Sequence, residues 1–76
     1  MTLFNYINQN IDRIKHDVKI GITSYSVLNQ WAIYSRYDYW KKLKNSTSNS
    51  VILIENEFQI SSDYVYKIIK KMETEI

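Results

Sequence analysis

One side of the last helical segment of this sequence has the residues best suited to bind a ligand. At 100° per residue, polar side chains between positions 61 and 70 lie on one side of a helix and apolar side chains lie on the other. Lysine ammonium groups can bind phosphate or guanine, and serine and tyrosine hydroxyls can bind phosphate or base edges. The candidate DNA-binding residues are Ser61, Ser62, Asp63, Tyr66, Lys67 and Lys70. The apolar residues opposite them are Val65, Ile68, Ile69, Met72 and Ile76.

Asp63 is the one acidic residue of this polar set. Because phosphate repels a carboxylate, Asp63 either accepts a hydrogen bond from a cytosine amino group, supports the N-terminus of the helix, or faces away from nucleic acid. The polar side could also be a solvated face of a small helical protein that binds nothing there. The sequence leaves these alternatives open.

A second basic cluster lies between positions 36 and 44 and is interleaved with aromatic residues. Its net charge is +3, because four basic residues stand against Asp38. Secondary phosphate contacts are expected from Arg36, Lys41, Lys42 and Lys44. With Tyr37, Tyr39 and Trp40, the cluster could instead bind a single strand by stacking. Aromatic residues at helical spacing more often belong to a core, so burial is the competing interpretation.

The sequence contains no arrangement of residues typical of an enzyme or a metal site. It has no cysteine, which excludes disulfides and thiolate ligands. His16 is the only histidine, and we interpret it as a surface residue although Asp12 lies one helical turn before it. Gly21 is the only glycine, so there is no glycine-rich phosphate loop or nucleophile elbow. We therefore expect a protein that is not an enzyme and has no cofactor or metal.

Length and composition predict one small all-α domain spanning residues 1–76. A chain of 76 residues has room for one core, and it contains 45% hydrophobic residues, 14% aromatic residues, one glycine and no proline. The net charge of +2 is too small to identify a polyanionic partner by itself. Because the sequence has neither a leader-like start nor an apolar run of roughly 18 residues, we expect a soluble, cytoplasmic protein without a membrane partner.

An apolar seam predicts a first helix from Thr2 to Val18. Thr2 is placed to cap its N-terminus, and Gly21 ends or interrupts it. The seam could pack inside the domain or against a second copy, since its spacing is that of a short coiled coil. We expect residues 1–44 to brace the domain and to offer a dimerisation surface. The seam consists of Phe4, Ile7, Ile11, Ile14 and Val18.

Three further helices are predicted. In residues 25–43, apolar side chains cover almost the whole circumference, which is typical of a central helix with several neighbours. The segment 45–50, NSTSNS, has the composition of a loop. Ser50 is the expected N-cap of a short helix after this loop, and Ser61 is the expected N-cap of the last helix. The sequence thus predicts four helices and no sheet.

The apolar residues on either side of Ser61 have a distinctive spacing. They are Ile54, Phe58, Ile60, Val65 and Ile68. With Ser61 as the polar residue that begins a recognition helix, residues 50–76 resemble the helix-turn-helix motif of DNA-binding regulators of bacteria, phages and mobile elements. Glu55 and Gln59 depart from that motif, which usually has a small residue and glycine at these two positions.

This resemblance implies a small sequence-specific DNA-binding protein, such as a phage or mobile-element transcriptional regulator, whose last helix enters the major groove. Because one such module makes few base contacts, we expect a homodimer or a protein partner on double-stranded DNA. The candidate dimer surfaces are Phe4, Ile7, Ile11 and the aromatic central helix. The alternative is a protein-interaction module, an inhibitor or adaptor, that binds through the aromatic and basic central helix.

Overall fold

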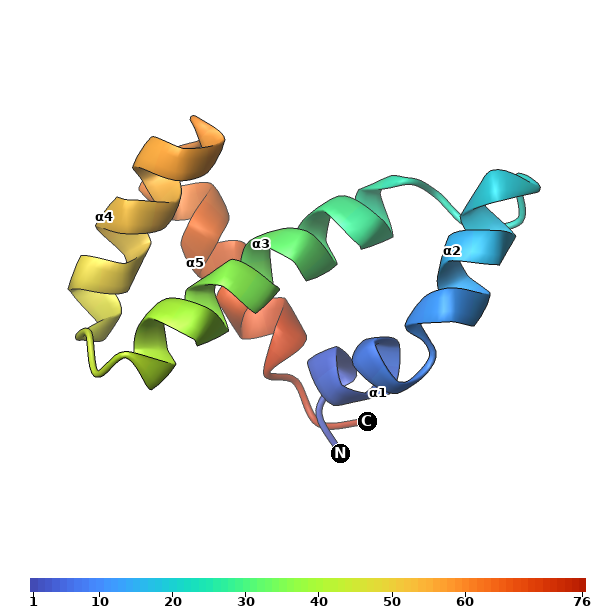
Figure 1. Ribbon diagram of the computed structural model, residues 1–76, viewed down its shortest axis with the longest axis horizontal. Helices are drawn as coiled ribbons and strands as arrows, with labels where there is room; N and C mark the ends of the chain where they lie inside the picture. Colours follow the sequence, from blue (N-terminus) through green and yellow to red (C-terminus); the bar gives the residue numbers. More distant parts are fainter.

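The computed structural model describes residues 1–76, and all its regular elements are helices (Figure 1). The all-α prediction is therefore confirmed. Five helices are present instead of four, because the predicted first helix is two separate helices. No helix has the length and apolar character needed to cross a membrane. The elements are α1 Leu3–Gln9, α2 Ile11–Lys19, α3 Ser26–Lys42, α4 Thr47–Phe58 and α5 Ser62–Met72.

The prediction of a single helix from Thr2 to Val18 is wrong, since the chain bends at Asn10. Thr2 caps α1 as expected, because its side-chain oxygen accepts a hydrogen bond of 3.2 Å from the backbone N–H of Asn5. At Asn10 the backbone leaves the helical region, with φ −112° and ψ 19°, and the side-chain amide donates to the carbonyl oxygen of Tyr6 at 2.8 Å. An asparagine that bonds to nearby backbone in this way competes with helical hydrogen bonds. α2 consequently starts in a new direction (Figure 1).

α3 is the central helix, as its apolar pattern predicts. It packs against α1, α4 and α5, and in Figure 1 it crosses in front of α5. Its buried residues are Ile33, Tyr34 and Tyr37. The ring of Tyr34 contacts the ring of Phe4 from α1, with centroids 4.6 Å apart, and the ring of Tyr37 at 5.5 Å. These aromatic contacts join α1 to the centre of the domain.

The predicted N-cap at Ser50 is wrong, because α4 begins earlier. The N-cap is Ser46, whose side chain accepts a hydrogen bond of 3.1 Å from the backbone N–H of Asn49. Ser50 is fully buried inside the helix, and its hydroxyl donates to the carbonyl oxygen of Ser46 at 2.8 Å. Several residues of the segment 45–50 can cap a helix, and capping at Ser46 adds a first turn without leaving the buried hydroxyl unsatisfied.

α4 and α5 meet at a corner formed by Gln59, Ile60 and Ser61. Gln59 adopts the left-handed conformation, with φ 57° and ψ 48°, and its side-chain amide donates to the carbonyl oxygen of Asn56 at 2.7 Å. Ser61 caps α5, as predicted, by accepting a hydrogen bond of 3.3 Å from the backbone N–H of Tyr64. The positive φ therefore falls at the position where the helix-turn-helix motif commonly has glycine.

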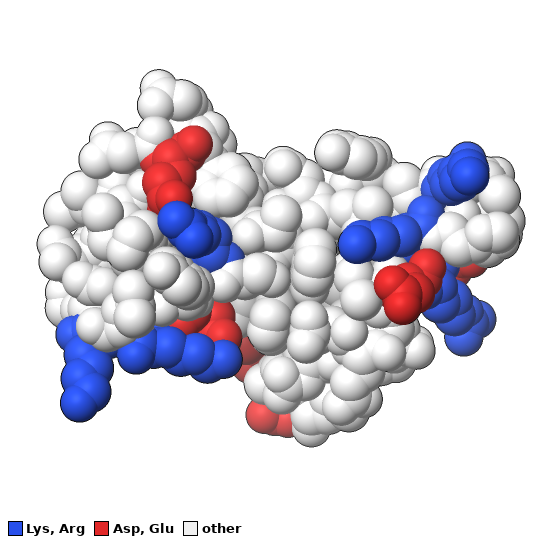
Figure 2. Space-filling model, in the orientation of Figure 1, with Lys and Arg blue, Asp and Glu red and all other residues white.

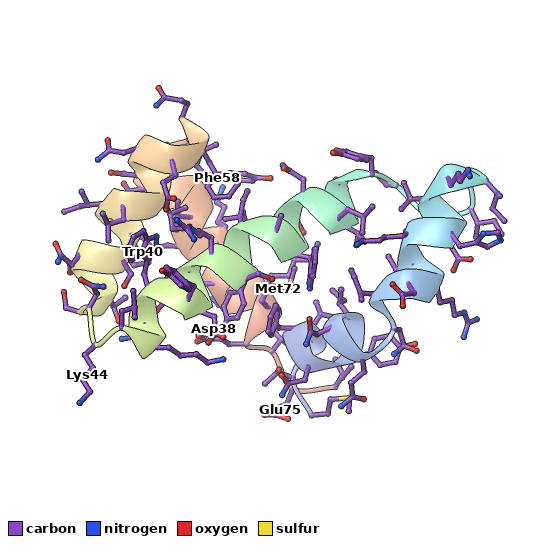
Figure 3. All side chains as sticks on the ribbon, in the orientation of Figure 1. Asp38, Trp40, Lys44, Phe58, Met72 and Glu75 are labelled. Atoms are coloured by element: carbon purple, nitrogen blue, oxygen red, sulfur yellow. The ribbon has the colours of Figure 1, made fainter.

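The core lies between α3, α4 and α5, and α1 adds Ile7 to it. Ile54, Val65 and Met72 are 0% exposed and Ile33 is 1% exposed, and Figure 3 places Met72 beside α3. Full burial of an aliphatic side chain of this size contributes about 1.5–3 kcal/mol. Ile76 lies outside the core and is 63% exposed, so its predicted place on the apolar side of the last helix is wrong. The reason is that α5 ends at Met72.

The two ends of the chain lie side by side (Figure 1). Thr2 and Glu75 form an isolated antiparallel β-bridge. The backbone N–H of Leu3 donates to the carbonyl oxygen of Thr74 at 2.8 Å, next to this bridge. The bridge ties the start of α1 to the segment that follows α5.

Candidate nucleic-acid interface

α5 has one buried and one exposed side. Its buried residues are Val65, Ile68, Ile69 and Met72. Of the predicted DNA-binding residues, Ser62 is half-buried at the start of the helix and Ser61 is exposed just before it. Exposed along the helix itself are Asp63, Tyr66, Lys67 and Lys70. The predicted residues thus share one accessible side of a helix whose other side is fixed by the core.

Lys67 and Lys70 have no acidic partner within the chain. The three ion pairs of the structure join other residues. Lys71, the next residue along, is engaged instead, because its Nζ donates to Oε1 of Gln30 at 2.8 Å. Tyr66 is 46% exposed, beside these free cations. This part of α5 therefore offers two unpaired ammonium groups and a phenol to an anionic partner.

The N-terminal end of α5 has the opposite charge. Asp63 lies in the first turn, where its carboxylate interacts favourably with the helix dipole. Of the three alternatives for Asp63, support of the helix N-terminus fits this position. The Oγ of Ser61 already caps the helix. The free positive charge of α5 accordingly lies at Lys67 and Lys70 and not at the N-terminus of the helix.

Arg36, one of the secondary phosphate candidates, is engaged between α3 and α4. Its Nε forms an ion pair of 2.9 Å with Oε2 of Glu57. Its guanidinium lies 4.5 Å from the ring centroid of Tyr39 and 4.8 Å from that of Trp40. Trp40, which lies between α3 and α4 in Figure 3, donates to Oε1 of the same Glu57 at 2.6 Å. Arg36 is therefore used to dock the two helices, and it is the least accessible of the four candidates.

The three lysines of the same cluster differ in their surroundings. Lys41 donates to Oγ1 of Thr47 at 3.1 Å, and Lys42 forms an ion pair of 2.9 Å with Asp38. Lys44 makes neither kind of contact and adopts a positive φ of 69° after the end of α3. Figure 2 shows one face of the molecule, in the orientation of Figure 1. Its basic side chains lie toward the two ends, with acidic side chains close to them and a broad uncharged area between. This face has no continuous basic surface.

The aromatic residues of α3 do not form an open stacking surface. Tyr37 is 5% exposed, so its ring cannot stack on a base. Trp40 is half-buried and its N–H is bound to Glu57. Tyr39 is the only one of the three whose ring is well exposed, at 46%. The interpretation of these rings as part of the core and its edge is the one that fits.

Tyr34 is a buried polar group with a structural role. Its hydroxyl donates to Oε2 of Glu73 at 2.9 Å. Burial raises the pKa of this hydroxyl well above its usual range, and the hydrogen bond to Glu73 and its negative charge raise it further. The phenol is therefore neutral at physiological pH and links α3 to the end of α5.

A groove that the sequence did not predict lies between α1, α2 and α3. Its volume is about 390 Å³. Ile7, Ile14 and Val27 give it an apolar lining from all three helices, and Arg13 and Asp17 lie along the wall formed by α2. No pattern within a single helix indicates this groove, because it depends on the bend at the end of α1.

The loop between α2 and α3 forms an apolar tip. Ile20 is 55% exposed, and Ile22 and Tyr25 are each 71% exposed. Thr23, within the same loop, lines the groove, so the tip and the groove adjoin. The sequence contains a signal for this tip, since Ile20 and Ile22 flank Gly21 and fall outside the first apolar seam.

No group of three or more histidine, cysteine or acidic side chains is close enough together to hold a metal ion. His16 lies exposed on α2.

Comparison of the chain with protein-family models, with curated proteins and with solved structures gives no match. The resemblance of residues 50–76 to a helix-turn-helix motif stays a prediction.

Proposed function

We propose that this protein binds double-stranded DNA and that α5 is the helix that enters the major groove. The observation that carries the proposal is the division of α5 into two sides. One side is buried in the core, while Tyr66, Lys67 and Lys70 on the other side are exposed, and neither lysine has an acidic partner. A helix held in this way can present cations to phosphate without losing its packing.

The corner before α5 supports this orientation. The left-handed Gln59 and the capping Ser61 set the direction in which α5 leaves α4. A turn of this length between two helices, with a capped second helix, is the arrangement that helix-turn-helix proteins use to project a recognition helix. The central helix α3 packs against both α4 and α5 and braces the pair.

The exposed residues of α5 have distinct proposed roles. Lys67 and Lys70 bind phosphate or guanine, and Ser62 and Tyr66 bind phosphate or base edges. Asp63 supports the helix N-terminus or accepts from a cytosine amino group. Lys41, Lys42 and Lys44 are the proposed secondary phosphate contacts, with Lys44 the least constrained of them.

One copy of α5 makes few base contacts, so we propose that a second copy or a protein partner completes the complex on DNA. A sequence-specific regulator of transcription, of the kind found in phages and mobile elements, fits a chain of this size. The proposed class rests on the resemblance of residues 50–76 and on the exposed side of α5.

Fluorescence anisotropy with random and genomic duplexes at two salt concentrations tests the proposal. Replacing Lys67 and Lys70 together with alanine should weaken binding to all duplexes and lower the salt slope by about one unit per lost phosphate contact. If either lysine reads guanine, discrimination at that base pair should fall by roughly 1–3 kcal/mol. Tyr66→Phe tests the adjacent hydroxyl separately.

The matched control is the Lys15→Ala/Lys19→Ala variant, which removes the same charge from α2 and should bind DNA like the wild type. Unchanged affinity in a folded Lys67→Ala/Lys70→Ala variant would overturn the assignment of α5. If affinity is instead lost on neutralising Lys41, Lys42 and Lys44, the DNA surface lies on the α3 side. If neither set matters, the protein-interaction alternative takes the place of DNA binding.

A further inference from the structure

α2 is the least covered helix of the molecule. It has no fully buried residue: Ile11 and Ile14 are half-buried against the core, and Val18 is half-buried as well. α1 is the main helix that it contacts. The apolar groove between α1, α2 and α3 opens beside it, and the apolar tip formed by Ile20, Ile22 and Tyr25 adjoins the groove. A protruding apolar tip and an apolar groove on one surface are complementary to each other but do not fill each other within one chain.

The charges of α2 have no ion-pair partners within the chain, although Nζ of Lys15 lies 5.5 Å from the ring centroid of Trp31. None of its charged side chains takes part in the three ion pairs of the structure. Arg13 and Asp17 are four residues apart and both line the groove. A helix with one unpaired cation and one unpaired anion on the same wall is complementary to an antiparallel copy of itself.

We propose that a second copy of this chain packs on this surface, with the two α2 helices antiparallel. A two-fold axis near residue 15 sets Arg13 opposite Asp17 of the second copy, and the symmetry repeats this contact in reverse. The same register sets Ile20 opposite Asn10 of the second copy. It brings the tip of each copy over the part of the partner's groove that Tyr6 and Asn10 line.

The charges of α2 favour a second copy of the chain over a lipid surface as the partner of the tip. A lipid anchor of this kind combines an apolar tip with clustered cations facing anionic headgroups. Here two acidic residues are interspersed with three basic ones between positions 12 and 19, so attraction to an anionic surface is weak. The same alternation provides opposite charges for an antiparallel partner.

This inference does not rest on DNA binding, because it concerns α2 and not the exposed side of α5. It overlaps only in part with the dimer surfaces expected from the sequence, since Ile11 lies on α2 and Ile7 lines the groove. Ile7 is 3% exposed, and the ring of Phe4 contacts Tyr34, so both serve the core of one copy. The surface that remains for a partner is α2, the groove and the tip.

Sedimentation equilibrium of the full chain without DNA tests the arrangement. The wild type should dimerise at high micromolar concentration. Arg13→Glu and Asp17→Arg, each alone, place like charges opposite each other twice and should raise the dissociation constant of the dimer at least about tenfold. The double variant Arg13→Glu/Asp17→Arg restores opposite charges and should recover most of the wild-type affinity. Lys67→Glu makes the same charge change as Arg13→Glu on α5 and should dimerise normally.

Circular dichroism of each variant establishes that it is folded, so that a monomer is not mistaken for an unfolded chain. Ile22→Asp, which changes a side chain 71% exposed in one copy, should weaken the dimer while leaving the helix content unchanged. A strictly monomeric wild type would overturn the proposal, and so would a double variant that dimerises no better than the single variants. A monomer that cosediments with phosphatidylcholine and phosphatidylserine vesicles would assign the tip to a lipid surface instead. The Lys67→Ala/Lys70→Ala variant should still dimerise, so failure of the DNA proposal and failure of this one are distinguishable.

Discussion

The C-terminal helix α5 and the N-terminal helix α2 each have one clear apolar side, yet the packing of their two regions differs. α3, α4 and α5 surround a core in which Ile54, Val65 and Met72 are fully buried. α2 has no buried residue at all. Periodicity therefore predicts that a helix forms, whereas the number of neighbouring helices decides how much its apolar side contributes to stability. In this molecule α3 has three helical neighbours and α2 has essentially one.

The largest difference between the two regions should appear on truncating an isoleucine in each. Ile68 is 2% exposed, so Ile68→Ala should lower the free energy of unfolding by about 2–5 kcal/mol. Ile14 is half-buried, and Ile14→Ala should cost about 1 kcal/mol because less apolar surface returns to water. Urea unfolding followed by circular dichroism measures both. Equal losses would mean that Ile14 is packed as tightly as Ile68, and the two regions would not differ in this respect.

A second test concerns Tyr34, which joins the two regions through Phe4 and Glu73. Its pKa in the folded protein is raised by burial above the unfolded value of about 10. The contribution of this protonated phenol to the free energy of unfolding is therefore fully present below about pH 10. It is lost as the pH rises further, because the phenol of the unfolded chain releases its proton first. Unfolding at neutral pH and above pH 10 should reveal this decline, and Tyr34→Phe should reduce it.

At neutral pH, Tyr34→Phe should itself cost about 0.5–1.5 kcal/mol, the net contribution of an ordinary hydrogen bond. Tyr25→Phe is the control, because Tyr25 is 71% exposed. The free energy of unfolding of this variant should fall at alkaline pH as much as that of the wild type. A Tyr34→Phe variant whose alkaline decline parallels that of the wild type would place the responsible groups elsewhere.

The smallest effects are expected at two turns that each contain a residue with positive φ. Gly21, in the N-terminal loop, has φ 84°, and Gln59, at the C-terminal corner, has φ 57°. No heavy atom lies within 4 Å of a Cβ added at Gly21, so Gly21→Ala should cost about 1 kcal/mol through the backbone alone. Gln59→Gly should raise the free energy of unfolding by roughly 0.5 kcal/mol. The reason is that relief of the left-handed strain outweighs the added conformational entropy of the unfolded chain.

Urea midpoints of these two variants should shift in opposite directions. If both variants are destabilised, the hydrogen bond from Gln59 to Asn56 outweighs the backbone strain at the corner. That result would mean that the side chain of Gln59, and not the conformation of its backbone, decides the stability of the corner.

The fold was predictable where one residue decides the local structure. Ser61 caps the last helix as predicted, and Val65, Ile68 and Met72 follow it at an unambiguous spacing. The bend at Asn10 was not predictable from periodicity, because the apolar seam continues through it without a break. The start of α4 was ambiguous for the opposite reason, since several residues of the segment 45–50 can cap a helix.

The candidate site follows the same division. Exposure of Tyr66, Lys67 and Lys70 could be predicted, because it depends only on the phase of one helix. The engagement of Arg36 by Glu57 could not, since these residues meet only when α3 and α4 pack. The groove beside α2 depends on the bend between two helices, and residue spacing along one helix contains no information about it.

The β-bridge between Thr2 and Glu75 makes the chain almost circular in space. The backbone N–H of Ile76 donates to the carbonyl oxygen of Met1 at 3.0 Å, so a few linking residues would suffice to join position 76 to position 1. A covalently closed chain of this kind would have a less disordered unfolded state, at little cost to the native one. The exposed turn around Lys44 could then be opened to give new termini. Such a permuted protein would begin at α4 and α5 and finish with α3, with the same helices in contact and a different order of synthesis.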